Sequence, residues 1–221
     1  MTRRPAAVLF DMDGTLVDSE KIWDVTLDEL ATRLGGELSA PTRQAMVGSN
    51  LASSLQMLHD DLGIAAGDLD GDARWLLDRT KHYFGHGLPW QAGARELLDA
   101  VHAAGITTAL VTSTHRDLVD VALRSIGAHY FDVEVCGDEV SHNKPHPEAY
   151  LTAAALLGVA AGDCVAIEDS PTGIAAAEAA GCAVLAVPSE VPVPPGRLRT
   201  VRDSLVGVDV ACLTALLAAR R

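Results

Sequence analysis

Two aspartates, Asp11 and Asp13, directly follow a short apolar run at residues 6–10. The run does not alternate with polar residues, which predicts a strand that is buried on both faces. Carboxylates at the end of such a strand lie at the rim of a sheet, where open α/β sheets bind ligands. Because a carboxylate can form a covalent phosphoenzyme, Asp11 is a candidate nucleophile for phosphoryl transfer. Asp13 is a candidate general acid that protonates the leaving oxygen and later deprotonates water.

Two carboxylates this close together repel each other unless a cation lies between them, which predicts a bound Mg²⁺. Taken alone, the pair also fits a solvated turn after a strand. The longer string at residues 11–20, DMDGTLVDSE, favours catalysis, because it resembles the first motif of the haloacid dehalogenase-like (HAD) hydrolase superfamily. Three further motifs of that superfamily would then be expected later in the chain.

A second candidate segment, Thr112-Ser113, ends the apolar run at residues 106–111. A hydroxyl at the carboxyl end of a strand can donate to a phosphate oxygen, and nearby backbone N–H groups can add to it. Thr112 matches the Ser/Thr position of the second motif of the superfamily, and Ser113 is a further candidate phosphate ligand. The alternative is that Ser113 or Thr114 only caps the next helix.

The third candidate is Lys144, which precedes a proline in the string NKPHP at residues 143–147. A residue before proline is pushed toward extended geometry, which keeps this lysine off any helix. An ammonium group near Asp11 would keep that carboxylate ionised and would neutralise the transferred phosphoryl group. A lone loop lysine is usually solvated, but this string stands where the third motif of the superfamily belongs. His146 is interpreted as loop structure.

Two more acids, Glu168 and Asp169, follow the apolar residues 165–167. Asp169 is expected to ligate Mg²⁺ directly, and Glu168 either directly or through water. The superfamily resemblance implies that Asp11, the backbone carbonyl of Asp13 and the substrate phosphate complete the metal site. The alternative is an acidic cluster that the dipole of the following helix favours.

The order of the elements predicts an α/β fold, a doubly wound parallel sheet with an inserted small α-helical cap. A crossover between parallel strands needs only about a dozen residues, so residues 18–88 form an insertion. Residues 1–17 and 89–221 then form the HAD-like core, and flexible joints are expected at 15–19 and 85–89. In the insertion, the periodicity predicts helices at residues 22–34, 40–47, 51–62 and 68–84.

The remainder of the chain alternates regularly between helices and strands. Helices are expected at residues 94–102, 115–126, 147–157, 171–180 and 209–219. Strands are expected at residues 106–111, 131–136, 163–167 and 182–187, and the proline-rich segment 188–195 is expected to be a loop.

Charge and composition narrow the class of partner. The net charge of −13 and the pI of about 4.9 argue against nucleic acids and membranes as partners. A phosphate ester is itself anionic, so local positive charge must hold it. The four cysteines form no C-x-x-C pair and are expected to be buried small hydrophobes. No targeting or spanning segment is recognised, so a cytoplasmic location without an obligate protein partner is expected.

These features predict a Mg²⁺-dependent phosphatase of a small phosphorylated metabolite. The string DSEKIW at residues 18–23 resembles the branch that includes 2-deoxyglucose-6-phosphate and hexitol-phosphate phosphatases. The main alternative is a β-phosphoglucomutase-like enzyme, which carries a histidine in the first cap helix and an arginine in a later cap loop. Here the matching positions are Trp23 and residues 48–51, which lack both. A non-catalytic binding protein is a remote alternative, because it would be expected to have lost one of the motif residues.

Selectivity in this superfamily is expected to come from cap side chains that face the site. The sequence alone does not distinguish which polar cap residues do so. The candidates are Arg43, Asn50, Arg74, Arg79 and Lys81.

Overall fold

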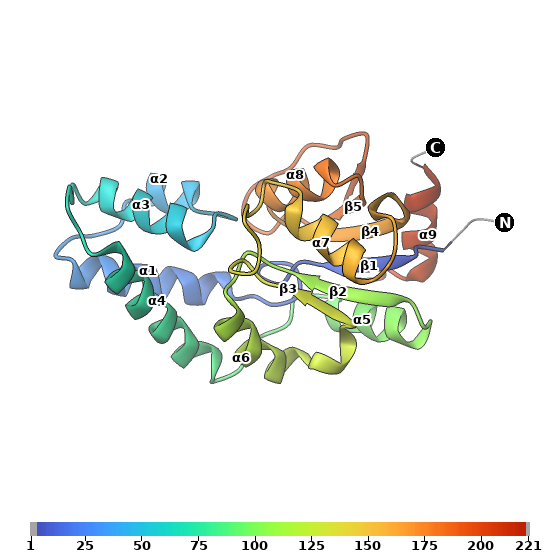
Figure 1. The fold of residues 1–221 in the computed structure, drawn as a ribbon, viewed down its shortest axis with the longest axis horizontal. Helices are drawn as coiled ribbons and strands as arrows, with labels where there is room; N and C mark the ends of the chain where they lie inside the picture. The colour runs from blue at the N-terminus through green and yellow to red at the C-terminus, as the bar shows by residue number, and fades with distance from the viewer. Residues whose placement is uncertain (1–3, 220–221) are drawn as a thin grey trace.

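Six short strands form a single sheet in residues 4–219, the part of the chain that the computed structural model describes (Figure 1). All neighbouring strands are parallel, in the order β3-β2-β1-β4-β5-β6. The strands are β1 (Ala7–Phe10), β2 (Thr107–Val111), β3 (Val133–Val135), β4 (Cys164–Glu168), β5 (Ala183–Ala186) and β6 (Arg199–Val201). From β1 the chain adds β2 and β3 on one side and then β4, β5 and β6 on the other side. The carboxyl ends of β1 and β4 therefore border a crevice at this switch in order.

Helices cover both faces of this sheet, as the sequence predicts for a doubly wound fold. On one face, Val8 and Phe10 of β1 share a buried cluster with α5, α6 and α9. On the other face, Ala7 and Leu9 pack with α7 and α8. The helices are α5 (Ala94–Ala103), α6 (Arg116–Ile126), α7 (Glu148–Leu156), α8 (Pro171–Ala179) and α9 (Val210–Ala219).

The inserted region between β1 and α5 is entirely helical apart from its connecting loops, and it lies beside the sheet-bearing part (Figure 1). Its helices are α1 (Glu20–Arg33), α2 (Ala40–Ala45), α3 (Leu51–Asp61) and α4 (Leu69–Phe84). They surround a separate buried cluster that includes Leu30, Leu58 and Leu76. The helical insertion is thus confirmed, while the exact division at residues 18–88 stays a prediction.

The two connections between the helical region and the core run side by side. The Asp18 N–H donates to the Pro89 carbonyl at 2.9 Å, and the Gln91 N–H donates to the Leu16 carbonyl at 2.9 Å. Val17 forms an isolated antiparallel bridge with Trp90. The two chain connections between the helical region and the core therefore form one short paired joint.

Most predicted elements agree with the observed bounds to within two residues. Strand β6 was not predicted, because Arg199–Val201 is only three residues long and has no apolar run. The alternative that Ser113 or Thr114 only caps α6 does not hold, because His115 occupies the N-cap position. Of the four cysteines, three are buried and Cys212 is half-buried, and all are thiols. No helix within residues 4–219 is long and apolar enough to cross a membrane.

Candidate active site

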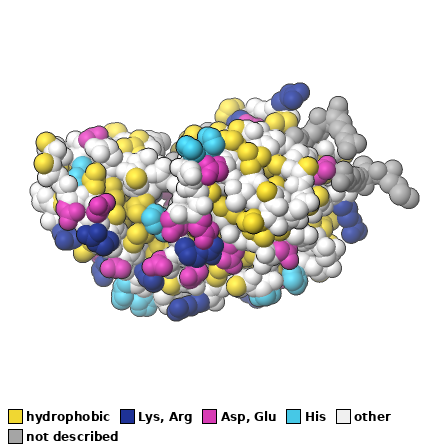
Figure 2. All heavy atoms as spheres, in the orientation of Figure 1, with side chains coloured by type: hydrophobic (Ala, Val, Ile, Leu, Met, Phe, Trp, Pro, Cys, Tyr) yellow, Lys and Arg dark blue, Asp and Glu magenta, His cyan; other side chains and the backbone are white. Residues whose placement is uncertain are grey.

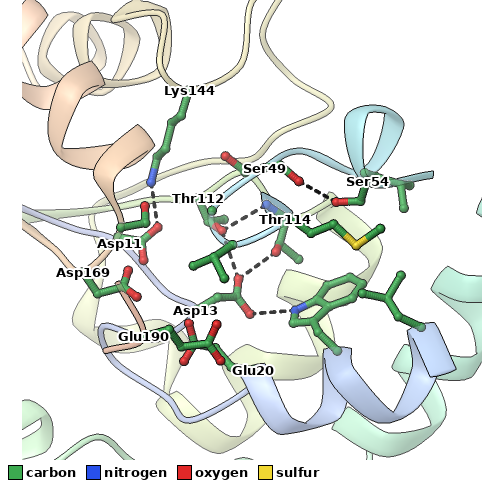
Figure 3. A pocket seen from close by; sticks show the side chains of 18 of the residues that line it. Asp11, Asp13, Glu20, Ser49, Ser54, Thr112, Thr114, Lys144, Asp169 and Glu190 are labelled. Carbon is green, nitrogen blue, oxygen red and sulfur yellow. Dashed lines mark hydrogen bonds and ion pairs between the residues drawn. The ribbon is translucent and has the colours of Figure 1, made fainter. Parts of the chain in front are cut away.

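The predicted motif residues converge at the carboxyl ends of the strands (Figure 3). Asp11 follows β1, Thr112 follows β2, and Asp169 follows β4. The backbone register holds these ends together, since the Asp11 N–H donates to the carbonyl of Ile167 in β4 at 3.0 Å. Lys144 reaches the same point from the loop between β3 and α7.

Lys144 is the centre of a buried charge network. Its Nζ donates to Asp11 Oδ1 at 2.6 Å, to Glu168 Oε1 at 2.6 Å and to the Val111 carbonyl at 3.0 Å. Burial disfavours the charged amine, but the carboxylates of Asp11 and Glu168 outweigh it and raise the pKa of Lys144 above its ordinary value. This lysine therefore stays a fixed positive charge beside Asp11.

Glu168 lies beneath this network and is inaccessible to solvent. Its Oε1 accepts a second hydrogen bond, from Tyr150 Oη at 2.5 Å, and its Oε2 accepts from Ser170 Oγ at 3.4 Å. At Gly173 in α8, a Cβ atom would lie 2.1 Å from the Glu168 oxygens, so only glycine allows the helix to approach this closely. Both oxygens of Glu168 are thus engaged by donors of the protein.

Three carboxylates form an oxygen-rich group at the floor of the site. Asp11, Glu168 and Asp169 each place an oxygen within 4.8 Å of the others. Burial raises the pKa of Asp11 to about 7, with the charge of Glu168 adding to it. Burial and the nearby charge of Asp11 also raise the pKa of Asp169 well above its ordinary value. Lys144 alone does not balance this charge, and an all-oxygen donor set suits Mg²⁺, so the group fits a magnesium site.

Asp13 points away from this floor, toward the helical region (Figure 3). Its Oδ1 accepts from Ser19 Oγ at 2.5 Å and from Trp23 Nε1 at 3.3 Å. Its Oδ2 accepts from Thr114 Oγ1 at 2.7 Å and from Thr112 Oγ1 at 3.4 Å. Ser19 occupies the N-cap position of α1, but its side chain makes no capping bond. The hydroxyl orients Asp13 instead.

Several residues that the sequence analysis did not connect with the site contribute to it. Thr114 was considered only as a helix cap, and Tyr150 belongs to an alanine-rich helix where an aromatic residue indicates core. Ser189 donates to Asp169 Oδ2 at 2.6 Å, and Thr15 donates to Asp169 Oδ1 at 3.2 Å. A hydroxyl two positions after Thr112 is a signal that could have identified Thr114, but nothing local marks Tyr150 or Ser189.

The motif residues open into a cavity of about 120 Å³ between the core and the helical region. The space-filling view shows the surface hollowed between these two parts (Figure 2). Ser113 lines the cavity near Thr112. The helical region contributes a mainly apolar wall made of Trp23, Leu27, Met46, Val47, Leu51, Leu76 and Leu77. Ser49 and Ser54 lie in this wall with their hydroxyls 2.5 Å apart.

Of the five polar cap candidates, Arg43 alone lines the cavity within the described residues. It contacts Asp24 of α1, and its guanidinium lies 3.7 Å from Glu190 Oε1. Asn50 caps α3. Arg79 pairs with Glu29 at 2.5 Å on the outside of the helical region, and Lys81 pairs with Asp117 at 3.3 Å. These contacts explain why most of the cap charges are structural or solvated.

Comparison with known proteins identifies the family. The model of the haloacid dehalogenase-like hydrolases matches residues 8–187, and the chain belongs to this family. The phosphorylated carbohydrates phosphatase of Thermotoga maritima is 34% identical over 176 residues, covering 79% of this chain and 81% of the relative. Hexitol phosphatase A of Escherichia coli K12 is 34% identical over 190 residues, covering 83% and 84%. A β-phosphoglucomutase structure from Clostridium difficile has a TM-score of 0.85 and 21% identity over 97% of both chains, which shows a shared fold.

Proposed function

We propose that this hydrolase is a Mg²⁺-dependent phosphatase that acts on the phosphate monoester of a sugar or polyol through an aspartyl phosphate on Asp11. The observation that carries the proposal is the geometry around Asp11. Its carboxylate is buried at the end of β1, one oxygen is held by Lys144 Nζ at 2.6 Å, and the side chain lines the cavity. A nucleophile needs this combination of fixed orientation and access to substrate.

The residues divide the reaction between them in two steps. In the first, a carboxylate oxygen of Asp11 attacks phosphorus, the P–O bond to the leaving group breaks, and Asp13 gives its proton to the leaving oxygen. In the second, Asp13 takes a proton from water, which attacks phosphorus and releases Asp11 and inorganic phosphate. The four donors around Asp13 keep its carboxyl group at the boundary between floor and cavity, where a leaving group or a water must lie.

The developing charge on the phosphoryl oxygens is met by Lys144, Thr112 and Ser113. When bound, Mg²⁺ supplies further positive charge to the same oxygens. Asp11, Asp169 and the carbonyl of Asp13 would hold the ion. Both oxygens of Glu168 already accept from side chains, which supports contact with the ion through water rather than directly.

The wall contributed by the helical region supports a sugar or polyol as the leaving group. An indole face and aliphatic side chains match the C–H surface of such a molecule, and the Ser49–Ser54 pair offers hydroxyl partners. The two sequence relatives named above also support this substrate class, because one is a phosphorylated carbohydrates phosphatase and the other is a hexitol phosphatase.

The test is phosphate release from glucitol 6-phosphate by the purified protein. We expect turnover that requires Mg²⁺, stops with EDTA, and needs a much higher Mg²⁺ concentration in Asp169→Asn. A Mg²⁺ titration of Asp169→Asn that matches the unmutated protein would remove Asp169 from the metal site. No phosphate release from any sugar or polyol ester would overturn the proposed function.

The mutase alternative is tested with β-glucose 1-phosphate and a trace of the 1,6-bisphosphate. Trp23, Gly48, Ser49 and Leu51 line the cavity. These positions lack the histidine and arginine expected of a mutase, so we expect inorganic phosphate and little glucose 6-phosphate. Glucose 6-phosphate that accumulates much faster than inorganic phosphate would establish the mutase activity instead.

A further inference from the structure

Two carboxylates face the cavity but have no part in the proposed phosphoryl transfer, namely Glu20 and Glu190 (Figure 3). Glu20 is the first residue of α1, and Glu190 belongs to the loop after β5. Ser189 connects this pair to the metal-site floor, because its hydroxyl lies 3.0 Å from Glu20 Oε1 and 2.6 Å from Asp169 Oδ2. The pair therefore flanks the space that a leaving group must occupy once its phosphate lies at Asp11.

Arg43 is the one lysine or arginine besides Lys144 that lines the cavity in the described part of the chain. Its guanidinium contacts Asp24 and lies 3.7 Å from Glu190 Oε1. One positive charge is thus shared among the carboxylates of Asp24 and Glu190, with Glu20 close by. Burial and the charge of Glu190 raise the pKa of Glu20 to about 7. Above that pH, the leaving-group space therefore carries more negative than positive charge.

We infer that Glu20 and Glu190 are specificity-determining residues that exclude a second anionic group from the substrate. The inference rests on the proposed function and refines its substrate class to monoesters whose leaving group is uncharged or carries an amine. The physical reason is Coulomb repulsion in a partly enclosed space, where the effective dielectric constant is well below that of water. The apolar wall and the Ser49–Ser54 pair accommodate neutral hydroxyl-rich molecules without opposing charge.

Three linear esters that differ only at C1 test this inference. Glucitol 6-phosphate has a hydroxymethyl group there, 6-phosphogluconate has a carboxylate, and 1-amino-1-deoxyglucitol 6-phosphate has an ammonium group. We expect kcat/KM for the neutral ester to exceed that for the carboxylate by about tenfold or more, and the amine to react at least as well as the neutral ester. Added KCl should reduce the preference, because salt screens charges that are partly exposed.

Charge variants give the sign of the effect. Glu20→Gln and Glu190→Gln should each lower the ratio of neutral to anionic kcat/KM several-fold, and Arg43→Gln should raise it. Glu37→Gln is the matched control, because Glu37 is an exposed carboxylate of the helical region that does not line the cavity; its ratio should equal that of the unmutated protein.

Two outcomes overturn the inference while leaving the phosphatase intact. One is equal kcat/KM for the neutral and anionic esters. The other is an amine ester that reacts as poorly as the carboxylate, because shape rather than charge would then decide. If none of the three esters were hydrolysed, the result would instead count against the proposed phosphatase function, on which the inference depends.

Discussion

The two walls of the cavity differ in how they are built. On the core side, the charged groups Asp11, Lys144, Glu168 and Asp169 are at most 6% exposed. They are held by short contacts such as the two 2.6 Å bonds of Lys144. On the helical side, the lining is mainly apolar and its polar contacts with the core are few. One is the bond from Thr172 Oγ1 to the Gly48 carbonyl at 2.6 Å, and another is the Arg43–Glu190 pair.

The two walls therefore contribute differently to catalysis and to substrate selectivity. Buried charges need partners fixed to a fraction of an ångström, and the ends of adjacent parallel strands provide such fixed positions. The leaving group differs in shape from one substrate to another. Much of the wall that contacts it belongs to the helical region, which is separate from the strand ends that hold the buried charges. Changes in the buried charged groups at the strand ends should therefore affect all substrates alike, whereas changes in the residues that face the leaving group should alter the relative rates of the substrates.

The largest effect is expected from Asp11→Asn. An amide cannot form the acyl phosphate, so kcat should fall on the order of a thousandfold or more for every ester tested. The Tm of this variant should stay within a few degrees of the Tm of the unmutated protein. The control is Asp203→Asn, which makes the same change at an exposed position on the sheet-bearing part of the protein. If Asp11→Asn retained a tenth of the activity, another residue would have to be the nucleophile.

A somewhat smaller loss of turnover, about a hundredfold to a thousandfold, is expected from Lys144→Met. Breaking a buried ion pair by removing one partner also leaves Glu168 and Asp11 uncompensated. This should lower the Tm by about 10 °C in the absence of Mg²⁺. Calorimetry and steady-state kinetics on the same preparation measure both effects.

The double variant Lys144→Met/Glu168→Gln separates the two roles of this lysine. Removing the uncompensated charge of Glu168 should recover part of the lost Tm, because an amide is cheaper to bury than a lone carboxylate. Activity should not return, since the positive charge beside Asp11 is still missing. Recovery of activity along with stability would mean that Lys144 serves the fold alone.

The smallest effect concerns the joint beneath the helical wall. Gly87 has a φ of +99°, where an added Cβ meets nothing within 4 Å but the backbone torsion is strained. If the helical wall moves to admit substrate, Gly87→Ala should lower turnover of a hexitol phosphate several-fold more than that of a small artificial ester. Gly85 has ordinary helical torsions, with φ −62°, so alanine there should perturb the joint less.

Gly35→Ala is the matched control for this joint. Gly35 lies between α1 and α2, has a φ of +90° and likewise has nothing within 4 Å of an added Cβ. It should lower the Tm by a similar amount while leaving the ratio of the two substrates unchanged. Equal effects of Gly87→Ala on both esters would show that the helical region is a fixed layer.

The fold class and the candidate residues of the core wall could be predicted from the amino-acid sequence alone. Continuous apolar runs predict buried strands, and chemical groups directly after them must lie at one edge of a parallel sheet. Asp11, Thr112 and Asp169 could therefore be named as candidates from local pattern, and the superfamily resemblance then favoured catalysis over the structural alternative for each. The resemblance carried by residues 11–20, which the family match confirms, added the order of the motifs and the inserted helical region. The short edge strand β6 escaped because three half-polar residues carry no periodic signal.

The hydrogen-bond partners of these groups could not be predicted from the sequence, because they come from distant segments that meet on folding. Tyr150 donates to Glu168 across 18 residues of sequence, and Ser189 donates to Asp169 across 20. The side chain of Ser19, at the N-cap of α1, donates to Asp13 and does not cap the helix. The same holds for the choice of Arg43 among the cap charges. Periodicity places a side chain on a face of its own helix. The group that this face contacts depends on how separate layers pack together. The local sequence pattern around a residue does not specify which residues of the opposite layer it will contact.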